Sequence, residues 1–356
     1  MANIRVLVVD DSAFMRKVIT DILNSEPGIE VVGKAKDGQD ALEKIEELKP
    51  DVVTMDVEMP VMDGLTALKT LMRTRPVPVV MLSSLTAQGA QLTMKALELG
   101  AVDFIAKPSG QISLDISGSR NDIVNKVKIA AGTKCLLTSY PTDDAPLAEP
   151  PGRTVSPLQA APGLSKLVLI GTSTGGPKAL HQVISKLPRH INAGILIVQH
   201  MPPGFTKSLA ERLDQISAVR VKEAEMGDRI MPGWAYVAPG DHHLKVVAGI
   251  DNWGRKELLV KLDQSPPRHG CRPAVDVMLE SVAEQFWSHM VCVIMTGMGH
   301  DGAAGMLKVR AKKARTIAEH ESTCVVYGMP KTAIETGQVD IIAPLAKIPE
   351  AIMQLL

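Results

Sequence analysis

The chain has 356 residues, 45% hydrophobic and 22% charged, which is enough for about two domains with cores of their own. Its 39 basic and 39 acidic residues cancel, and aromatic residues make up only 3%, so a nucleic-acid-binding protein is disfavoured. The 4 cysteines are widely spaced without a C-x-x-C pair, which argues against a disulfide framework and a zinc ribbon.

The first apolar stretch, residues 6–9, is ended by Asp10 and Asp11 and is too short for a signal peptide. No run of about 18 apolar residues is present, so we expect no insertion into a membrane. The composition predicts an α/β protein of the cytoplasm.

Short β-branched runs at residues 4–9, 31–32, 52–55, 77–82 and 102–105 are separated by segments with helical spacing, near 13–25, 37–49, 64–74 and 88–99. Strands that alternate with helices predict a doubly wound parallel sheet of five strands. We place this first domain at residues 1–125, with a further amphipathic stretch near 121–131 at its end.

Residues 126–164 include a proline-rich stretch with little apolar periodicity, which predicts a linker. A second doubly wound α/β domain is expected at 165–356, with buried strands at 167–170, 195–198 and 291–295. Its helices are expected near 177–187, 204–216, 273–286, 301–312 and 330–336. Residues 219–263 alternate in polarity and predict inserted β-hairpins.

Carboxylates stand at the ends of two predicted strands in the first domain. Asp10 and Asp11 end the first strand, and Asp56 ends the third. Because the carboxyl ends of parallel strands face the functional crevice, these side chains should converge there. Three like charges need a cation, and oxygen ligands suit Mg²⁺.

Ser83 and Lys107 follow the fourth and fifth strands. A hydroxyl and an ammonium beside a metal-bound carboxylate suit phosphoryl transfer onto that carboxylate. Singly, Asp11 can be a helix cap and Lys107 a solvated charge. Five such residues at matched strand ends favour the phosphoryl site.

In the second domain, residues 171–177 form a glycine-rich turn between a strand and a helix. Gly171, Ser173 and Gly175 fit the nucleophile elbow G-x-S-x-G. Pro177 stands where a phosphate-binding loop needs lysine, and Ser173 stands at the second glycine of a dinucleotide fingerprint, so both alternatives fail.

His200 and Asp301 also come soon after predicted buried strands. Separately, His200 can be a loop histidine and Asp301 a helix cap. Together with Ser173 they predict the nucleophile, base and orienting acid of a hydrolytic triad. The chain order Ser–His–Asp differs from the Ser–Asp–His order of α/β-hydrolases.

The segments 8–12, 55–64, 82–84 and 106–108 resemble the receiver domain of response regulators. The resemblance implies that Asp56 accepts a phosphoryl group from a sensor histidine kinase. It also implies that Mg²⁺ is bound by Asp10, Asp11, Asp56 and the carbonyl of Glu58.

By the same resemblance, Ser83 and Lys107 contact the phosphoryl group. Phe104 occupies the place of an aromatic switch residue, although a plain core phenylalanine is an equal alternative.

The segments 170–177, 199–202, 272–276, 296–302 and 328–330 resemble the chemotaxis protein-glutamate methylesterases of the CheB family. The resemblance implies Ser173 as nucleophile, His200 as base and Asp301 as orienting acid. The backbone N–H groups of Thr174 and Met298 would form the oxyanion hole. No cofactor is expected in this domain.

His300 is an unusual residue in that motif and is able to compete for the Asp301 carboxylate. The histidines other than His200 are interpreted as structural or surface residues.

These features predict a phosphorylation-activated hydrolase that demethylates glutamate methyl esters on chemoreceptors, releases methanol and deamidates receptor glutamines. The resemblance to the family also implies that the receiver obstructs the catalytic cleft until it is phosphorylated. One alternative is a non-enzymatic response regulator whose second domain binds a partner. A DNA-binding regulator is disfavoured because no helix-turn-helix pattern is present.

Overall fold

A computed structural model of the chain describes residues 3–107, 116–133, 164–251, 254–286 and 288–356. The chain divides into two compact units, residues 1–144 and 145–356, which are described separately. Most of the predicted linker, residues 134–163, lies outside the described residues.

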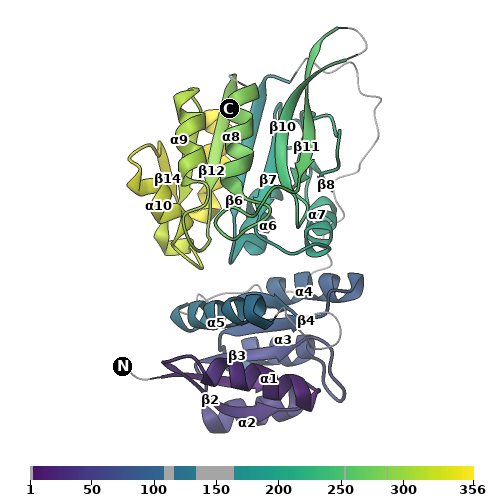
Figure 1. Ribbon diagram of the computed structural model, residues 1–356, viewed down its shortest axis with the longest axis vertical. Coiled ribbons are helices and arrows are strands. Elements are labelled where there is room, and N and C mark those ends of the chain that lie inside the picture. Colours follow the sequence, from purple (N-terminus) through teal and green to yellow (C-terminus); the bar gives the residue numbers. More distant parts are fainter. Residues whose placement is uncertain (1–2, 108–115, 134–163, 252–253, 287) are drawn as a thin grey trace. The chain divides into compact units, whose positions relative to one another are not determined.

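The first unit contains one parallel sheet in the order β2-β1-β3-β4-β5 (Figure 1). Its strands are β1 (Ile4–Val9), β2 (Ile29–Ala35), β3 (Val52–Asp56), β4 (Val79–Ser83) and β5 (Asp103–Ala106). The central strands β3 and β4 are buried along their whole length, as expected for a sheet that is covered on both faces. The predicted five-stranded doubly wound sheet is confirmed.

Helices follow each of these strands: α1 (Ala13–Asn24), α2 (Gly38–Leu48), α3 (Gly64–Thr74), α4 (Ala87–Leu99) and α5 (Ile116–Gly132). Each of the first four helices is preceded by a capping residue whose side chain accepts a backbone N–H of the first turn: Ser12, Asp37, Asp63 and Thr86. On one face, α1 and α5 share a core cluster. α5 continues past the predicted boundary at residue 125, because Val127 and Ala130 extend its buried face.

The second unit contains a parallel sheet in the order β14-β13-β12-β6-β7-β9-β8. Its strands are β6 (Lys166–Thr172), β7 (Gly194–Gln199), β8 (Arg220–Glu223), β9 (Trp234–Val237), β12 (His289–Ile294), β13 (Arg315–Glu319) and β14 (Ile341–Ala343). The helices are α6 (Gly176–Ile184), α7 (Phe205–Ile216), α8 (Val275–Gln285), α9 (Ala303–Ala311), α10 (Met329–Glu335) and α11 (Ile348–Leu355), with short 3₁₀ turns η1 (Glu321–Thr323) and η2 (Leu345–Lys347).

A hairpin of β10 (His243–Ile250) and β11 (Lys256–Asp263) projects from this unit (Figure 1) and packs on α8. The alternating polarity of residues 219–263 predicts inserted β-hairpins. That expectation is right for β10 and β11, but β8 and β9 instead extend the main sheet in parallel. Alternating polarity shows a half-buried strand and does not distinguish parallel from antiparallel pairing.

Candidate active site and phosphorylation site

Three adjacent strands at the centre of the second sheet lead to the candidate catalytic residues. β6 lies between β12 and β7, with Gly171 paired to both Ile294 and Val198. Ser173 follows β6 directly, His200 follows β7 directly, and Asp301 lies on the loop between β12 and α9. The parallel register therefore brings these three segments to one edge of the sheet.

The turn that carries Ser173 is tied to both neighbouring strands. The Ser173 N–H donates to the carbonyl of Thr296 (3.0 Å), and Gln199 Nε2 donates to the carbonyl of Ser173 (2.9 Å). Gly175 begins α6 at φ +79°, a conformation that favours glycine. At Gly176 a Cβ would lie 1.9 Å from Gln199 Oε1, so this position has no room for a side chain.

His200 is bound to Asp301. Its Nε2 donates to Asp301 Oδ2 at 2.7 Å, and both side chains are largely buried. The other ring nitrogen, Nδ1, is thereby left as the atom able to accept a proton. Within the described residues no hydrogen bond joins Ser173 to this ring. Bonds between nucleophile and base often tighten only when substrate binds.

The carboxylate of Asp301 lies at the amino end of α8. Oδ2 accepts the N–H of Val275 (2.7 Å) and Oδ1 that of Asp276 (2.9 Å). Burial alone would raise the pKa of Asp301, but His200 and these two N–H groups hold the pKa below its usual range. Asp301 is therefore an anion that can stabilise a positive charge on His200.

The pKa of His200 is raised to about 9. Burial opposes protonation, but the hydrogen bond to Asp301 and the adjacent thiol of Cys271 outweigh it. The protonated ring therefore stabilises the fold below the ordinary histidine value of 6.5, and this contribution is lost as the pH rises through the raised pKa. The general-base role predicted for His200 has the opposite pH dependence, because a general base must be neutral.

We predict that the kcat/KM for ester hydrolysis rises with pH through a titration that lies above 6.5, the ordinary histidine value. A pH–rate profile of methanol release measures this titration, with the Ser173→Ala protein as the blank for spontaneous hydrolysis. An acid limb at or below the ordinary value would contradict the raised pKa.

The two residues expected to form the oxyanion hole both lie near Ser173. Thr174 follows it directly, and the Thr174 carbonyl accepts a hydrogen bond from Thr296 Oγ1 (2.9 Å). Met298 follows Gly297, where a Cβ would lie 2.8 Å from the Ser173 Cβ. Their role as oxyanion donors stays a prediction.

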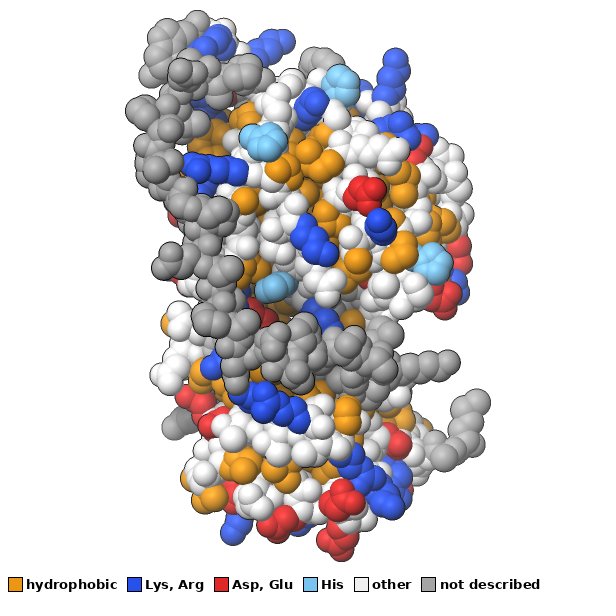
Figure 2. All heavy atoms as spheres, turned by 180° about the vertical axis from the view of Figure 1, so that it is seen from behind, with side chains coloured by type: hydrophobic (Ala, Val, Ile, Leu, Met, Phe, Trp, Pro, Cys, Tyr) orange, Lys and Arg blue, Asp and Glu red, His pale blue; other side chains and the backbone are white. Residues whose placement is uncertain are grey.

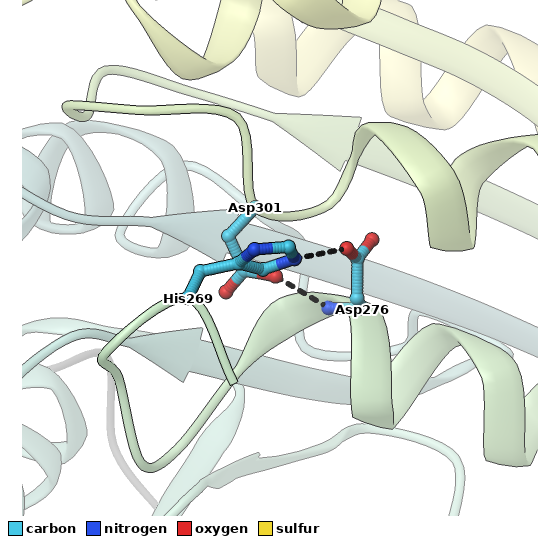
Figure 3. A group of neighbouring side chains, drawn as sticks. All are labelled: His269, Asp276 and Asp301. Carbon is cyan, nitrogen blue, oxygen red and sulfur yellow. Dashed lines mark hydrogen bonds and ion pairs between the residues drawn. The ribbon is translucent and has the colours of Figure 1, made fainter. Parts of the chain in front are cut away.

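A second carboxylate, Asp276, is linked reciprocally to the loop of Asp301. Asp276 Oδ1 accepts the N–H of Gly302 (3.0 Å) and Gly305 (2.6 Å) at the start of α9. Asp301 meanwhile accepts the N–H of Asp276, as Figure 3 shows. Asp301 thus accepts N–H groups from the first turn of α8, which contains Asp276. Asp276 in turn accepts N–H groups at the start of α9, which follows Asp301. His300, which is able in principle to compete for Asp301, bonds instead to His269 (3.0 Å), and no hydrogen bond joins it to Asp301 among the described residues.

In the first unit Asp10, Asp11 and Asp56 present carboxylate oxygens that all lie within 4.8 Å of one another. Lys107 Nζ lies 2.9 Å from Asp10 and 2.7 Å from Asp56. Burial raises the pKa of Asp56 to about 6, with Asp10 acting in the same direction and Lys107 opposing them. An all-oxygen set with an excess of negative charge fits Mg²⁺.

The other predicted phosphoryl-site residues are placed as follows. Glu58 is exposed, and its backbone N–H donates to Asp56, so its carbonyl belongs to the same turn. Ser83 ends β4 beside Asp56, but its hydroxyl bonds to the carbonyl of Gly89 (3.1 Å) and to Thr93. Phe104 is buried, with Lys126 Nζ 5.2 Å from its ring centroid. Contact of Ser83 with a phosphoryl group therefore requires its hydroxyl to rotate.

Comparison with known proteins decides the family. The family model "CheB methylesterase" matches residues 168–352, and "Response regulator receiver domain" matches 6–116. The chain is 57% identical, over the full length of both chains, to a protein of Syntrophomonas wolfei named protein-glutamate methylesterase/protein-glutamine glutaminase 1. The chain belongs to the CheB methylesterase family.

A Thermotoga maritima relative of this family, also named protein-glutamate methylesterase/protein-glutamine glutaminase, is 48% identical over 99% of this chain and 98% of its own. The crystal structure titled as the Thermotoga maritima CheB methylesterase catalytic domain superposes with a TM-score of 0.51, at 48% identity, and covers 54% of this chain and 99% of that chain. The second unit therefore has the fold of a CheB catalytic domain.

Two residues of this CheB-family site were given no role by the sequence analysis. Gln199 is buried and ties the Ser173 turn to β7, and Asp276 ties the Asp301 loop to α8. Both lie inside family signature segments. The sequence signal for Asp276 was an acidic residue in the first turn of a predicted helix. That signal does not show which other helix Asp276 contacts, because this contact depends on tertiary structure.

No helix among the described residues is both long and apolar enough to cross a bilayer. On the described part of the face in Figure 2, basic and acidic side chains are interspersed on each unit.

Proposed function

We propose that this protein is a phosphorylation-regulated hydrolase that cleaves glutamate methyl esters on chemoreceptors in the cytoplasm and deamidates receptor glutamines. The names of its full-length relatives support this assignment. The observation that carries it is the His200–Asp301 pair (2.7 Å) at the same sheet edge as the Ser173 elbow.

In this mechanism Ser173 Oγ attacks the ester carbonyl and His200 Nδ1 takes its proton. Asp301, bound to Nε2, stabilises the imidazolium that forms. The N–H groups of Thr174 and Met298 stabilise the oxyanion, and one such donor is worth about 3 kcal/mol of barrier. His200 then protonates the departing methoxide. Water hydrolyses the acyl-enzyme to glutamate, and on a glutamine the same route releases ammonia.

The direct test is methanol release from methylated receptor membranes, measured with and without a small-molecule phosphodonor. We expect release in both conditions and a higher rate with the donor. Absence of release in both conditions would contradict the hydrolase.

Phosphorylation is assigned to Asp56, with a chemotaxis histidine kinase as the donor. Asp10, Asp11, Asp56 and the Glu58 carbonyl would bind Mg²⁺, which would neutralise charge on the incoming phosphoryl group. Lys107, already bound to Asp56 (2.7 Å), would pair with the phosphoryl oxygens. Ser83 would rotate toward them, and Phe104 would respond as the switch residue.

We predict that Asp56→Asn abolishes the activation by a phosphodonor while leaving the basal rate of methanol release. The substitution removes the acceptor oxygen, whereas the catalytic residues belong to the other unit. A 100-fold activation corresponds to about 2.7 kcal/mol, so its loss is measurable. Asp21→Asn, an exposed carboxylate of α1, is the matched control and should keep full activation. An Asp56→Asn protein that is still activated would contradict this site.

A further inference from the structure

Two histidines form a close pair beside the catalytic loop. His269 Nδ1 lies 3.0 Å from His300 Nε2, and the ring centroids are 4.4 Å apart with an interplanar angle of 73°. Both residues are exposed. The proposed esterase mechanism uses neither of them.

The other nitrogen of His269 is bound to a buried acid. His269 Nε2 lies 3.0 Å from Oδ2 of Asp276, whose side chain is only 1% exposed (Figure 3). A carboxylate only accepts, so Nε2 carries the proton and Nδ1 presents its lone pair toward His300. A histidine whose distal N–H is bound by a carboxylate is the arrangement that proteins use to orient metal ligands.

The spacing of the pair fits a transition metal. Two nitrogens bound to one tetrahedral Zn²⁺ at about 2.0–2.1 Å are separated by about 3.3 Å. The observed 3.0 Å therefore has to open by only a few tenths of an ångström. Because His300 is exposed, its ring is able to turn, exchange its proton through water from Nε2 to Nδ1, and direct the Nε2 lone pair to the ion.

A second group, His269, Asp276 and Asp301, also has ligand atoms within 4.8 Å of one another. This inner group is less suitable. Both carboxylates already accept N–H groups from the first turns of α8 and α9, and Arg268 Nη2 lies 3.9 Å from Asp276. A cation there would meet the positive ends of two helices and a guanidinium.

We propose that His269 and His300 form a binding site for a divalent transition metal, with water as the remaining ligands, and that the bound ion inhibits the hydrolase. His300 directly precedes Asp301 and is close in sequence to Met298. An ion on His300 restrains this loop and adds positive charge next to Asp301, the residue that binds His200 and stabilises the positive charge that develops on it. The binding site itself does not depend on the proposed esterase function.

The test uses the full chain without a polyhistidine tag, in excess Mg²⁺ so that the oxygen ligands of the first unit are occupied. Co²⁺ alone is the probe, and the visible absorption of nitrogen-bound Co²⁺ is the readout. We expect one Co²⁺ that Zn²⁺ displaces, and binding weakened by about tenfold or more in His269→Gln and in His300→Gln. His289→Gln, at the opposite end of β12, is the control and should bind normally.

His300→Cys tests contact with the ion directly, because a thiolate ligand adds an intense near-ultraviolet charge-transfer band. Normal Co²⁺ binding by His300→Gln would overturn the pair and assign the ion to the inner group instead. Lack of Co²⁺ binding by the wild-type chain would overturn the site altogether. Zn²⁺ should slow methanol release in the wild type and not in His300→Gln, and equal rates with and without Zn²⁺ would overturn the inhibitory role.

Discussion

Replacing Ser173 with alanine should abolish methanol release from methylated receptors. Loss of the nucleophile in a hydrolase of this type lowers kcat by about 10⁶-fold, and only the contribution of binding and oxyanion donors remains. Methanol release by the purified variant, with and without a phosphodonor, is the measurement.

The fold should tolerate this substitution. Among the described residues the Ser173 hydroxyl makes no hydrogen bond, while the turn is held by its backbone N–H and carbonyl. The free energy of unfolding should therefore change by less than about 1 kcal/mol. Ser185→Ala, at the far end of α6, is the matched control and should keep full activity. A Ser173→Ala protein that still releases methanol would leave the second unit as a partner-binding module.

Replacing Asp301 with asparagine should lower kcat by about 10⁴-fold. The carboxylate accepts from three donors, His200 Nε2 and the N–H groups of Val275 and Asp276. An amide has one oxygen, so its NH₂ group must face at least one of these donors. Where the NH₂ group faces His200, it donates to Nε2 and places the ring proton on Nδ1, which can then no longer take the proton of Ser173.

Asp301→Asn should also lower stability, by about 1.5–3 kcal/mol for hydrogen bonds to a charged group. Because the pKa of Asp301 is lowered, its contribution is present above the ordinary aspartate value of 3.8 and is lost as the pH falls through the lowered pKa. Denaturant unfolding at neutral and acid pH measures both effects, and the variant should approach the wild type at acid pH.

The Asp340→Asn variant is the control that distinguishes a loss of stability from a loss of catalysis. Asp340 is another partly buried carboxylate and accepts the Thr316 N–H (2.8 Å) near the amino ends of β13 and β14, away from the site. This control should lose stability and keep its kcat. Equal loss of activity in both variants would show that Asp301 acts only through the fold.

The strand ends explain how much of the site could be predicted from sequence. Ser173 and His200 directly follow buried strands, and the parallel register alone brings such positions together. Asp301 is separated from β12 by a loop, and its position depends on α8, which comes from a different part of the chain. The hydrogen bonds from α9 to Asp276 also join segments that are far apart in the sequence, so the sequence does not predict them. The direction of the Ser83 hydroxyl likewise depends on Gly89 and Thr93 of α4.

The reciprocal contacts of Asp301 and Asp276 have a consequence for engineering. The acid of the proposed triad cannot be transplanted alone onto another parallel sheet, since its position is set by two helix starts that each depend on the other. A grafted site would have to carry α8 and α9 together as one unit, with both carboxylates. The nucleophile and the imidazole, by contrast, follow the adjacent strands β6 and β7 directly, and the Ser173 turn needs besides them only the carbonyl of Thr296 after β12.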